Sequence, residues 1–211
     1  MKNTFGNNIS VTVFGESHGE AVGAVLDGVP AGIEVDIDFI KKQLDLRRPF
    51  GRISTPRKEV DEFQILSGFF NGKTTGTPIC LVIANENTHS KDYSNSYGNA
   101  RPGHADYTAY CKYNGYEDYR GGGHFSGRVT AGLVAVGAIA IKILADKGIK
   151  IGTHISKCAG VTDDAFSDLN NQIDLLNNKM FAVINDEKGK EMIASIEKAA
   201  ENGDSVGGVI E

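Results

Sequence analysis

The stretch SGRVTAGLVAVGAIAIKILADKG, residues 126–148, decides the fold class of this chain. From Val129 to Ala145 it is apolar nearly all round, which is typical of a helix buried in a core. We expect this helix to start at Ser126 or Gly127 and to end before Gly148, a residue type suited to a left-handed C-cap. The run is short for a membrane span of ~20 residues, and it is interrupted at Gly132, Gly137 and Lys142. We therefore predict a central core helix and no membrane segment.

Short strand patterns and isolated helices surround this run. We expect strands at Ile9–Phe14, Ala21–Leu26, Phe63–Leu66, Ile79–Ala84, Ile149–Ile155 and residues 206–211. Asp36 can cap a helix that ends before Pro49, and Asn185 or Asp186 a second, amphipathic one that stops at Gly203. Residues 85–99 have the composition of a polar loop, and residues 162–178 show little pattern. The lack of regular βαβ alternation predicts an α+β fold with antiparallel strands.

The bulk properties of the chain exclude several classes of protein. A net charge of −5 argues against nonspecific nucleic-acid binding as the main role. The N-terminus lacks an apolar stretch of signal-peptide length. Three scattered cysteines without a C-x-x-C pair predict reduced thiols in the cytoplasm and no metal site.

Residues 101–128, RPGHADYTAYCKYNGYEDYRGGGHFSGR, carry the clearest functional signal. His104 and His124 lie in glycine-rich loops, and a triple glycine precedes the start of the core helix. Glycine lets the backbone approach an anion, and a helix N-terminus offers unpaired N–H groups. Three arginines add fixed positive charge, at Arg101, Arg120 and Arg128. This pattern predicts a site for an anionic ligand.

A second basic segment runs from Lys41 to Lys58 in this otherwise acidic protein. Pro49, Gly51 and Pro56 favour arginines held on loops, where their forked guanidinium groups can bind phosphate or carboxylate in a bidentate way. The alternative is a solvated basic face. His18 lies in another glycine-bounded loop, beside Ser17, and could exchange a proton near neutral pH; a structural histidine in a turn is its alternative.

Two motif matches fail on spacing or context. Residues 68–74, GFFNGKT, have three residues between the glycines where a P-loop needs four, so we predict a hairpin turn. Residues 15–19, GESHG, match the nucleophile-elbow pattern, but a strand pattern follows where a helix is needed. An acyl-transfer hydrolase is therefore only a weak alternative.

Seven segments together resemble the chorismate synthase family. They are FGESHG (14–19), DGVPAG (27–32), LDLRRP (44–49), KTTGTPI (73–79), RPGHADYT (101–108), DYRGGGHFSGRVTAGLVAVGAIA (118–140) and DSVG (204–207). The resemblance implies an α+β fold with helices sandwiched between antiparallel sheets. It also implies a cytoplasmic homotetramer whose partner is a phosphorylated small molecule, with no nucleic-acid or membrane partner.

The same resemblance implies a lyase of the shikimate pathway that uses reduced FMN. The reaction is a 1,4-anti elimination of phosphate from 5-enolpyruvylshikimate 3-phosphate, which gives chorismate. His18 near the phosphate and His104 near the flavin would be the acids. The substrate-binding residues would be Ser17, Arg47, Arg48, Arg52 and Arg128. The FMN contacts would be His124, Phe125 and Ser126, and Arg47 and Arg52 would hold NADPH in members that reduce their own flavin.

Two departures from the family pattern qualify these expectations. Many members carry Arg-Ser-Ser or Arg-Ala-Ser where this chain has His124-Phe125-Ser126, which removes one charge from the flavin site. Family members are also considerably longer, so we expect residues 1–211 to be a single domain truncated at its C-terminus. A non-catalytic fragment that binds flavin or a phosphorylated ligand, and an inert folded fragment, are the alternative hypotheses.

Overall fold

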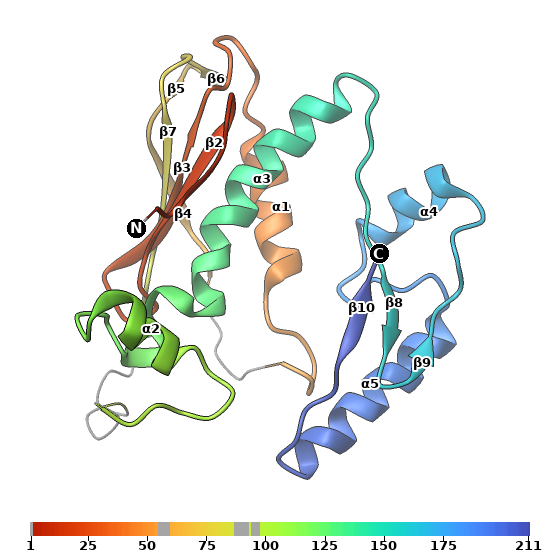
Figure 1. Cartoon of the computed structure of the whole chain (residues 1–211). Coiled ribbons are helices and arrows are strands. Elements are labelled where there is room, and N and C mark those ends of the chain that lie inside the picture. The colour runs from red at the N-terminus through yellow and green to blue at the C-terminus, as the bar shows by residue number, and fades with distance from the viewer. Residues whose placement is uncertain (1, 55–59, 87–92, 94–97) are drawn as a thin grey trace. The chain divides into compact units, whose positions relative to one another are not determined.

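A computed structural model describes residues 2–54, 60–86, 93 and 98–211. The chain divides into two compact units (Figure 1). Unit 1 comprises Met1–Asp45 and Glu59–Ile143, and unit 2 comprises Leu46–Lys58 and Leu144–Glu211. Each unit combines helices with antiparallel strands, so the predicted α+β class is confirmed. The single-domain expectation stays a prediction.

Unit 1 is built on a five-stranded antiparallel sheet in the order β1-β2-β3-β7-β4. Its strands are β1 (Thr4–Gly6), β2 (Ser10–Gly15), β3 (Ala21–Asp27), β7 (Ile79–Ala84) and β4 (Phe63–Ser67). Side chains alternate between the two faces of a strand, and Val22, Ala24 and Leu26 of β3 face the core. Their partners on β7 are Ile83, Leu81 and Ile79, all almost completely buried.

Two helices cover that buried face, α3 (Thr130–Ala145) and α1 (Ile37–Arg47) (Figure 1). Ile40 and Leu44 of α1 lie one helical turn apart and are both 1% exposed, as the predicted helical face requires. The Asp36 carboxylate accepts a hydrogen bond from the Phe39 amide and so caps α1, as predicted. Helix α3 is the predicted core helix, and Ala135, Val136 and four neighbouring small or apolar residues are buried.

Helix α3 approaches β3 closely because both elements carry a glycine at the contact. A β-carbon at Gly132 would stand 2.5 Å from the carbonyl carbon of Gly23. A helical segment at Gly127–Ala145 has the length and apolar composition of a membrane span, a test that core helices also pass. The packing of α3 into this core supports its interpretation as a buried helix.

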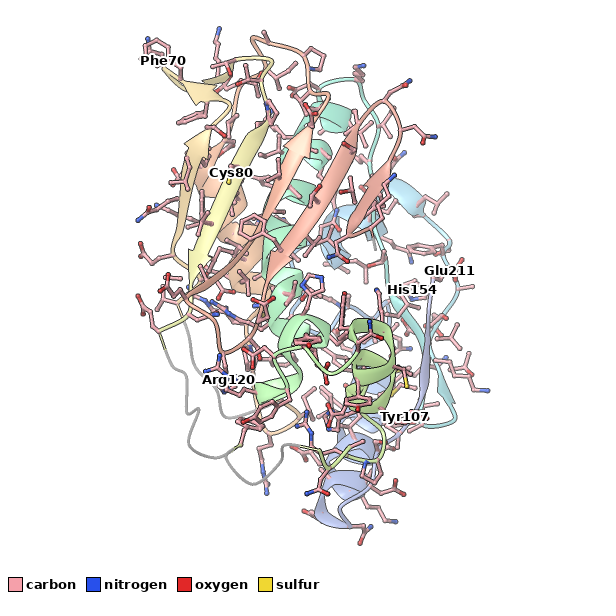
Figure 2. All side chains as sticks on the ribbon, turned by 60° about the vertical axis from the view of Figure 1, so that its left-hand side comes forward. Phe70, Cys80, Tyr107, Arg120, His154 and Glu211 are labelled. Atoms are coloured by element: carbon pink, nitrogen blue, oxygen red, sulfur yellow. The ribbon has the colours of Figure 1, made fainter. Side chains whose placement is uncertain are left out.

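The remaining short elements of unit 1 lie in the segments that connect the strands of the sheet and α3. Strands β5 (Phe69–Phe70) and β6 (Lys73–Thr74) form the hairpin predicted for residues 68–74, with Phe70 exposed at its end (Figure 2). Helix α2 (Asp106–Tyr113) and two 3₁₀ segments, η2 (Arg120–Phe125) and η3 (Gly127–Val129), lead into α3. Ser126 caps η3 by accepting a hydrogen bond from the Arg128 amide.

Unit 2 contains a three-stranded antiparallel sheet in the order β10-β8-β9, and two helices. The strands are β8 (Ile155–Cys158), β9 (Val161–Thr162) and β10 (Gly208–Ile210), and the helices α4 (Leu169–Leu176) and α5 (Asp186–Glu201). Asn185 caps α5, as predicted, by accepting from the amides of Glu187 and Lys188. Met192 of α5 is completely buried in the core of this unit.

One secondary-structure prediction in unit 2 is wrong, and one helix was not predicted. A strand was expected at Ile149–Ile155, but β8 begins only at Ile155, and Ile149 and Ile151 are largely exposed. Residues 162–178 show little sequence pattern, yet they include α4. The expected loop at residues 85–99 lies mostly outside the described residues.

Candidate active site

The loop at residues 16–19, between β2 and β3, carries Ser17 and His18. The Ser17 side chain is completely buried, although serine is a polar residue that usually stays exposed. Its backbone N–H donates to the carbonyl of Gly123 at 3.1 Å, and its hydroxyl donates to the carbonyl of Gly121 at 3.0 Å. The glycine run predicted to hold an anion therefore holds the His18 loop.

These contacts indicate that one particular nitrogen of the His18 ring, Nδ1, carries a hydrogen. Ser17 Oγ and His18 Nδ1 are 3.1 Å apart. A hydroxyl has one hydrogen to donate, and Ser17 directs it to the Gly121 carbonyl, so Oγ accepts from His18. In this arrangement Nδ1 of His18 carries a hydrogen.

The glycine run has the backbone conformation that only glycine adopts easily. Gly121, Gly122 and Gly123 have φ values of 58°, 83° and 53°, all in the region that disfavours side chains. At Gly121 a β-carbon would also stand 2.7 Å from Ser17 Oγ. Glycine is therefore needed here for close packing on the His18 loop as well as for backbone freedom.

Tyr93 and Arg101 connect His18 to the segment that carries His104. The Tyr93 ring meets the His18 ring edge-on with centroids 4.9 Å apart, and the Arg101 guanidinium lies 5.8 Å from the Tyr93 centroid. Arg101 makes a bidentate ion pair with Asp106 at 2.8 and 3.0 Å, and this hydrogen bonding lowers the pKa of Asp106. His104 is exposed in the turn between them, and its amide donates to the Arg101 carbonyl at 3.3 Å.

A second bidentate ion pair lies at the start of the glycine run. Arg120, labelled in Figure 2, donates to both oxygens of Asp118 at 2.8 and 2.7 Å. The hydrogen bond from Arg120 is the main cause that lowers the pKa of Asp118, and His18 lowers it further through its charge. Both members of the pair are partly exposed, so Asp118 offsets part of the positive charge of Arg120.

Arg128 occupies a different environment from the other arginines. Its side chain is 5% exposed and forms a buried ion pair with Asp61. Its Nε donates to Asn85 Oδ1 at 2.9 Å, and one terminal nitrogen donates to the Ala84 carbonyl at 3.0 Å. These contacts hold Arg128 among protein groups at the end of β7. Its substrate-binding role stays a prediction.

The predicted flavin contacts lie around a cavity of about 400 Å³ in unit 1. His124 and Phe125 line this cavity together with Phe14, Tyr113 and Tyr119. His124 Nδ1 lies 2.9 Å from the Gly15 carbonyl, which can only accept, so Nδ1 carries the hydrogen. Ser126 does not line the cavity but adjoins it as the cap of η3.

The remaining predicted residues belong to unit 2. Arg47 ends α1, Arg48 follows it, and Arg52 is exposed in the next turn. Arg57 and Lys58 of the basic segment lie outside the described residues. The structure thus brings Ser17, His18 and the glycine run together within unit 1, and it leaves the predicted roles of Arg47, Arg48 and Arg52 untested.

Sequence reasoning missed Tyr93, Asn85, Asp61 and Asp118. Tyr93 and Asn85 fell within the stretch interpreted as a polar surface loop, and no local signal distinguishes them there. Asp61 follows the basic segment and gives no motif. Asp118 stands two residues before Arg120, a spacing that could have suggested the ion pair.

The sequence and structure of the chain were compared with those of known proteins, and the matches agree on one family. Residues 9–211 match the family model for chorismate synthase. A chorismate synthase from Dehalococcoides mccartyi is 45% identical across all of this chain and 58% of its own length. One from Methanocaldococcus jannaschii is 49% identical, again across all of the chain and 59% of its own length. A crystal structure of chorismate synthase, 28% identical, superposes with a TM-score of 0.70 over 96% of this chain and 56% of the other.

The fold and the site thus define an α+β protein with a histidine held against a glycine run. The chain belongs to the chorismate synthase family, as its sequence motifs indicated. It spans about 58% of the length of the curated relatives that it matches.

Proposed function

We propose that this chain carries an active site that eliminates phosphate from 5-enolpyruvylshikimate 3-phosphate to give chorismate. In this 1,4-anti elimination the C–O bond to phosphate breaks with its electron pair on oxygen. A C–H bond breaks as well, and the ring gains a double bond without net oxidation. Membership of the chorismate synthase family supports this assignment. The structural observation that supports it most is the position of His18, which is held beside Ser17 and the glycine run.

His18 is the proposed proton donor to the departing phosphate. Phosphate leaves readily only when the charge that develops on it is offset, which a positioned acid can do. With Nδ1 directed at Ser17 Oγ, the donated proton would come from Nε2 of the imidazolium form of His18. Ser17 orients the ring, and its own position is set by the glycine run.

The proposed anion-binding groups are the arginines; Ser17, whose hydroxyl donates to the Gly121 carbonyl, stays a predicted substrate contact. Arg47, Arg48 and Arg52 would supply the charge that binds the substrate phosphate and carboxylates, because guanidinium groups match both in a bidentate way. Arg128 keeps its proposed place in this group. Arg47 and Arg52 are also the proposed NADPH contacts.

The cavity in unit 1 fits the planar ring of FMN but not its phosphate group. Aromatic side chains line it, among them Phe14, Tyr113 and Phe125, and suit a planar ring. Glu117 Oε2 is buried without a hydrogen-bond partner among the described residues, so it could accept from a ring N–H. The lining contains four carboxylates, at Glu16, Asp106, Glu117 and Asp118, and no described lysine or arginine. A phosphate group therefore does not fit inside this cavity.

His124, Phe125 and Ser126 are accordingly proposed to contact the ring end of FMN, with His104 as the acid beside it. Reduced FMN, when bound, would supply an electron-rich ring able to lend an electron and to accept the hydrogen that leaves the substrate. The protein's share is to exclude water and hold the ring against the substrate. A homotetrameric assembly and a cytoplasmic location complete the proposal.

An anaerobic assay with reduced FMN and 5-enolpyruvylshikimate 3-phosphate tests the reaction, with chorismate and released phosphate measured together. We expect turnover in the unmodified protein and its near-complete loss in the His18→Ala and His104→Ala variants. Phe70→Ala serves as the control, because Phe70 is 69% exposed on the β5–β6 hairpin. Normal turnover in His18→Ala would refute its role as the acid.

Titration of FMN by fluorescence quenching separates catalysis from binding. We expect Phe125→Ala to weaken FMN binding and Phe70→Ala to leave it unchanged. FMN binding without chorismate formation would favour the alternative of a non-catalytic binding fragment. The absence of both would favour an inert fragment.

A further inference from the structure

Asn85 joins the loop that carries His18 to the end of β7. Its side-chain Nδ2 donates to the carbonyl of Glu16 at 3.0 Å and to the carbonyl of Gly19 at 2.9 Å. Its backbone N–H donates to the carbonyl of Glu20 at 3.0 Å. Glu16 and Gly19 are the two ends of the tight turn that holds Ser17 and His18, so one side chain ties both ends together.

The orientation of the Asn85 carboxamide follows from its partners. Carbonyl oxygens can only accept, so the group facing Glu16 and Gly19 is the NH₂. Arginine can only donate, so the atom facing Arg128 Nε at 2.9 Å is the oxygen. This combination of two donated bonds and one accepted bond suits asparagine, since aspartate cannot donate and serine has one hydrogen.

Arg128 is itself fixed, which makes Asn85 a firm anchor. The buried ion pair with Asp61 and the bond to the Ala84 carbonyl hold the guanidinium in place. The His18 turn is thus held on one side by Asn85 and on the other by the glycine run, through the Ser17 contacts with Gly121 and Gly123.

We infer that Asn85 is a positioning residue that sets the place of the His18 ring, an inference that rests on the function proposed above. Asn85 acts through the turn backbone, and Arg128 and Asp61 act through Asn85. A catalytic group displaced by about 1 Å can lose about a hundredfold in rate. Loss of the Asn85 tie should therefore lower kcat far more than it changes KM.

The Asn85→Asp variant tests this inference. It keeps the shape of the side chain and an acceptor for Arg128, but it places oxygen against the carbonyls of Glu16 and Gly19. Asn177→Asp is the matched control. Asn177, in unit 2, also donates from Nδ2 to a backbone carbonyl, that of Ile151 at 2.9 Å, so the control adds the same charge and removes one bond of the same kind.

NMR provides a readout that does not depend on turnover. In Asn85→Asp we expect the His18 imidazole signals to shift and the Ser17 amide to exchange about tenfold faster or more. Amides of the β3–β7 ladder should keep their protection, which shows that the fold is intact. His18 signals and Ser17 exchange equal to those of the unmodified protein would overturn the inference.

A second measurement covers the case in which Asn85→Asp does not fold. In the unmodified protein the Asn85 side-chain NH₂ protons should exchange slowly with solvent, because both are donated to carbonyls. Exchange as fast as that of an exposed side-chain amide would overturn the inference without any variant.

Kinetics distinguish failure of this inference from failure of the proposed function. An unmodified protein that forms no chorismate refutes the proposed function, while the NMR measurements still decide the role of Asn85. Turnover in the unmodified protein with an unchanged kcat in Asn85→Asp refutes the positioning role alone. We expect kcat to fall about tenfold to a hundredfold in Asn85→Asp and to remain unchanged in Asn177→Asp.

Discussion

Gly121 lies so close to the His18 imidazole that a β-carbon at position 121 would stand 2.3 Å from Cε1 of the ring. No residue with a side chain can occupy that position unless the ring or the turn moves. The glycine run therefore shapes the site by steric fit as well as by hydrogen bonding. This relationship makes Gly121 the most direct test of the His18 geometry.

Gly121→Ala should displace His18 and lower turnover by about a hundredfold. The matched control is Gly122→Ala. Gly122 also has a positive φ, of 83°, but the nearest atom to a β-carbon there would be 3.9 Å away. Both variants carry a left-handed backbone cost of about 1–2 kcal/mol, so the difference between them isolates the clash with His18. Equal turnover in the two variants, measured with the anaerobic assay, would contradict this expectation.

Asp61→Ala should be strongly destabilising, because it removes the Asp61 carboxylate from its ion pair with the buried Arg128 guanidinium. Breaking a buried pair in this way costs about 3–5 kcal/mol, measurable by chemical denaturation. The control is Asp174→Ala, which breaks the exposed ion pair with Lys150 and should cost about 0–1 kcal/mol. Similar losses in the free energy of unfolding in the two variants would show that the Arg128–Asp61 ion pair is not desolvated.

Gly132→Ala should lower the free energy of unfolding, although alanine favours helices by about 1 kcal/mol over glycine. The added carbon meets the backbone of Gly23, and such overpacking costs about 1–3 kcal/mol. Gly137→Ala in the same helix meets nothing within 4 Å and should gain up to about 1 kcal/mol. Thermal denaturation should therefore shift the two variants in opposite directions. A stabilised Gly132→Ala variant would show that α3 and β3 are not in close contact.

Asp118 should contribute to acid sensitivity. Its pKa in the folded protein is lowered, chiefly by the hydrogen bond from Arg120, so the ionised form stabilises the fold. That contribution is complete above the ordinary aspartate pKa of about 3.9 and is lost as pH falls through the lower folded value.

Denaturation series at pH values from about 6 down to about 2 test this dependence. We expect stability to decline below about pH 4, with a shallower decline in Asp118→Asn. Arg120→Gln should give a similarly shallow decline, because it removes the partner that lowers the pKa of Asp118. An unaltered pH dependence in both variants would contradict the ion pair.

The main body of unit 1 follows from local sequence patterns. Helix α1 has its cap at Asp36, α3 has its apolar run, and β3 and β7 have β-branched apolar residues at the predicted positions. These signals suffice because each element buries a face that its own sequence defines. Helix α4 was missed because its sequence is rich in Asn and Asp, which disfavour helix interiors.

Local hydrogen bonds explain why α4 forms nevertheless. Asp168 caps its first turn, and the Gln172 side chain accepts from the amides of Ser167 and Asp168. The prediction of a strand at Ile149–Ile155 was wrong for a different reason. The position of β8 depends on pairing with β10, which lies far away in the sequence, and a local pattern cannot supply that register.

The sequence motifs indicated Ser17, His18 and the glycine run, but not what holds them. Asn85 and Tyr93 reach the site only through tertiary contacts, and the Asn85–Arg128 bond spans 43 residues. The same limit applies to the cavity, because its acidic and aromatic lining comes from β2, α2, η2 and the loops next to them.

The bond from the Ser17 hydroxyl to Gly121 spans 104 residues of chain, and this separation dictates an order of assembly. Strands β2 and β3 are neighbours in sequence and can pair early, since short loops close at low entropic cost. The turn between them gains its full support, from Asn85 and from the glycine run, only after the polypeptide has been synthesised past Gly123 and the glycine run has folded back. We therefore expect a nascent chain to acquire its sheet well before it acquires a fixed His18, and the proton-donating geometry to be among the last features that folding completes.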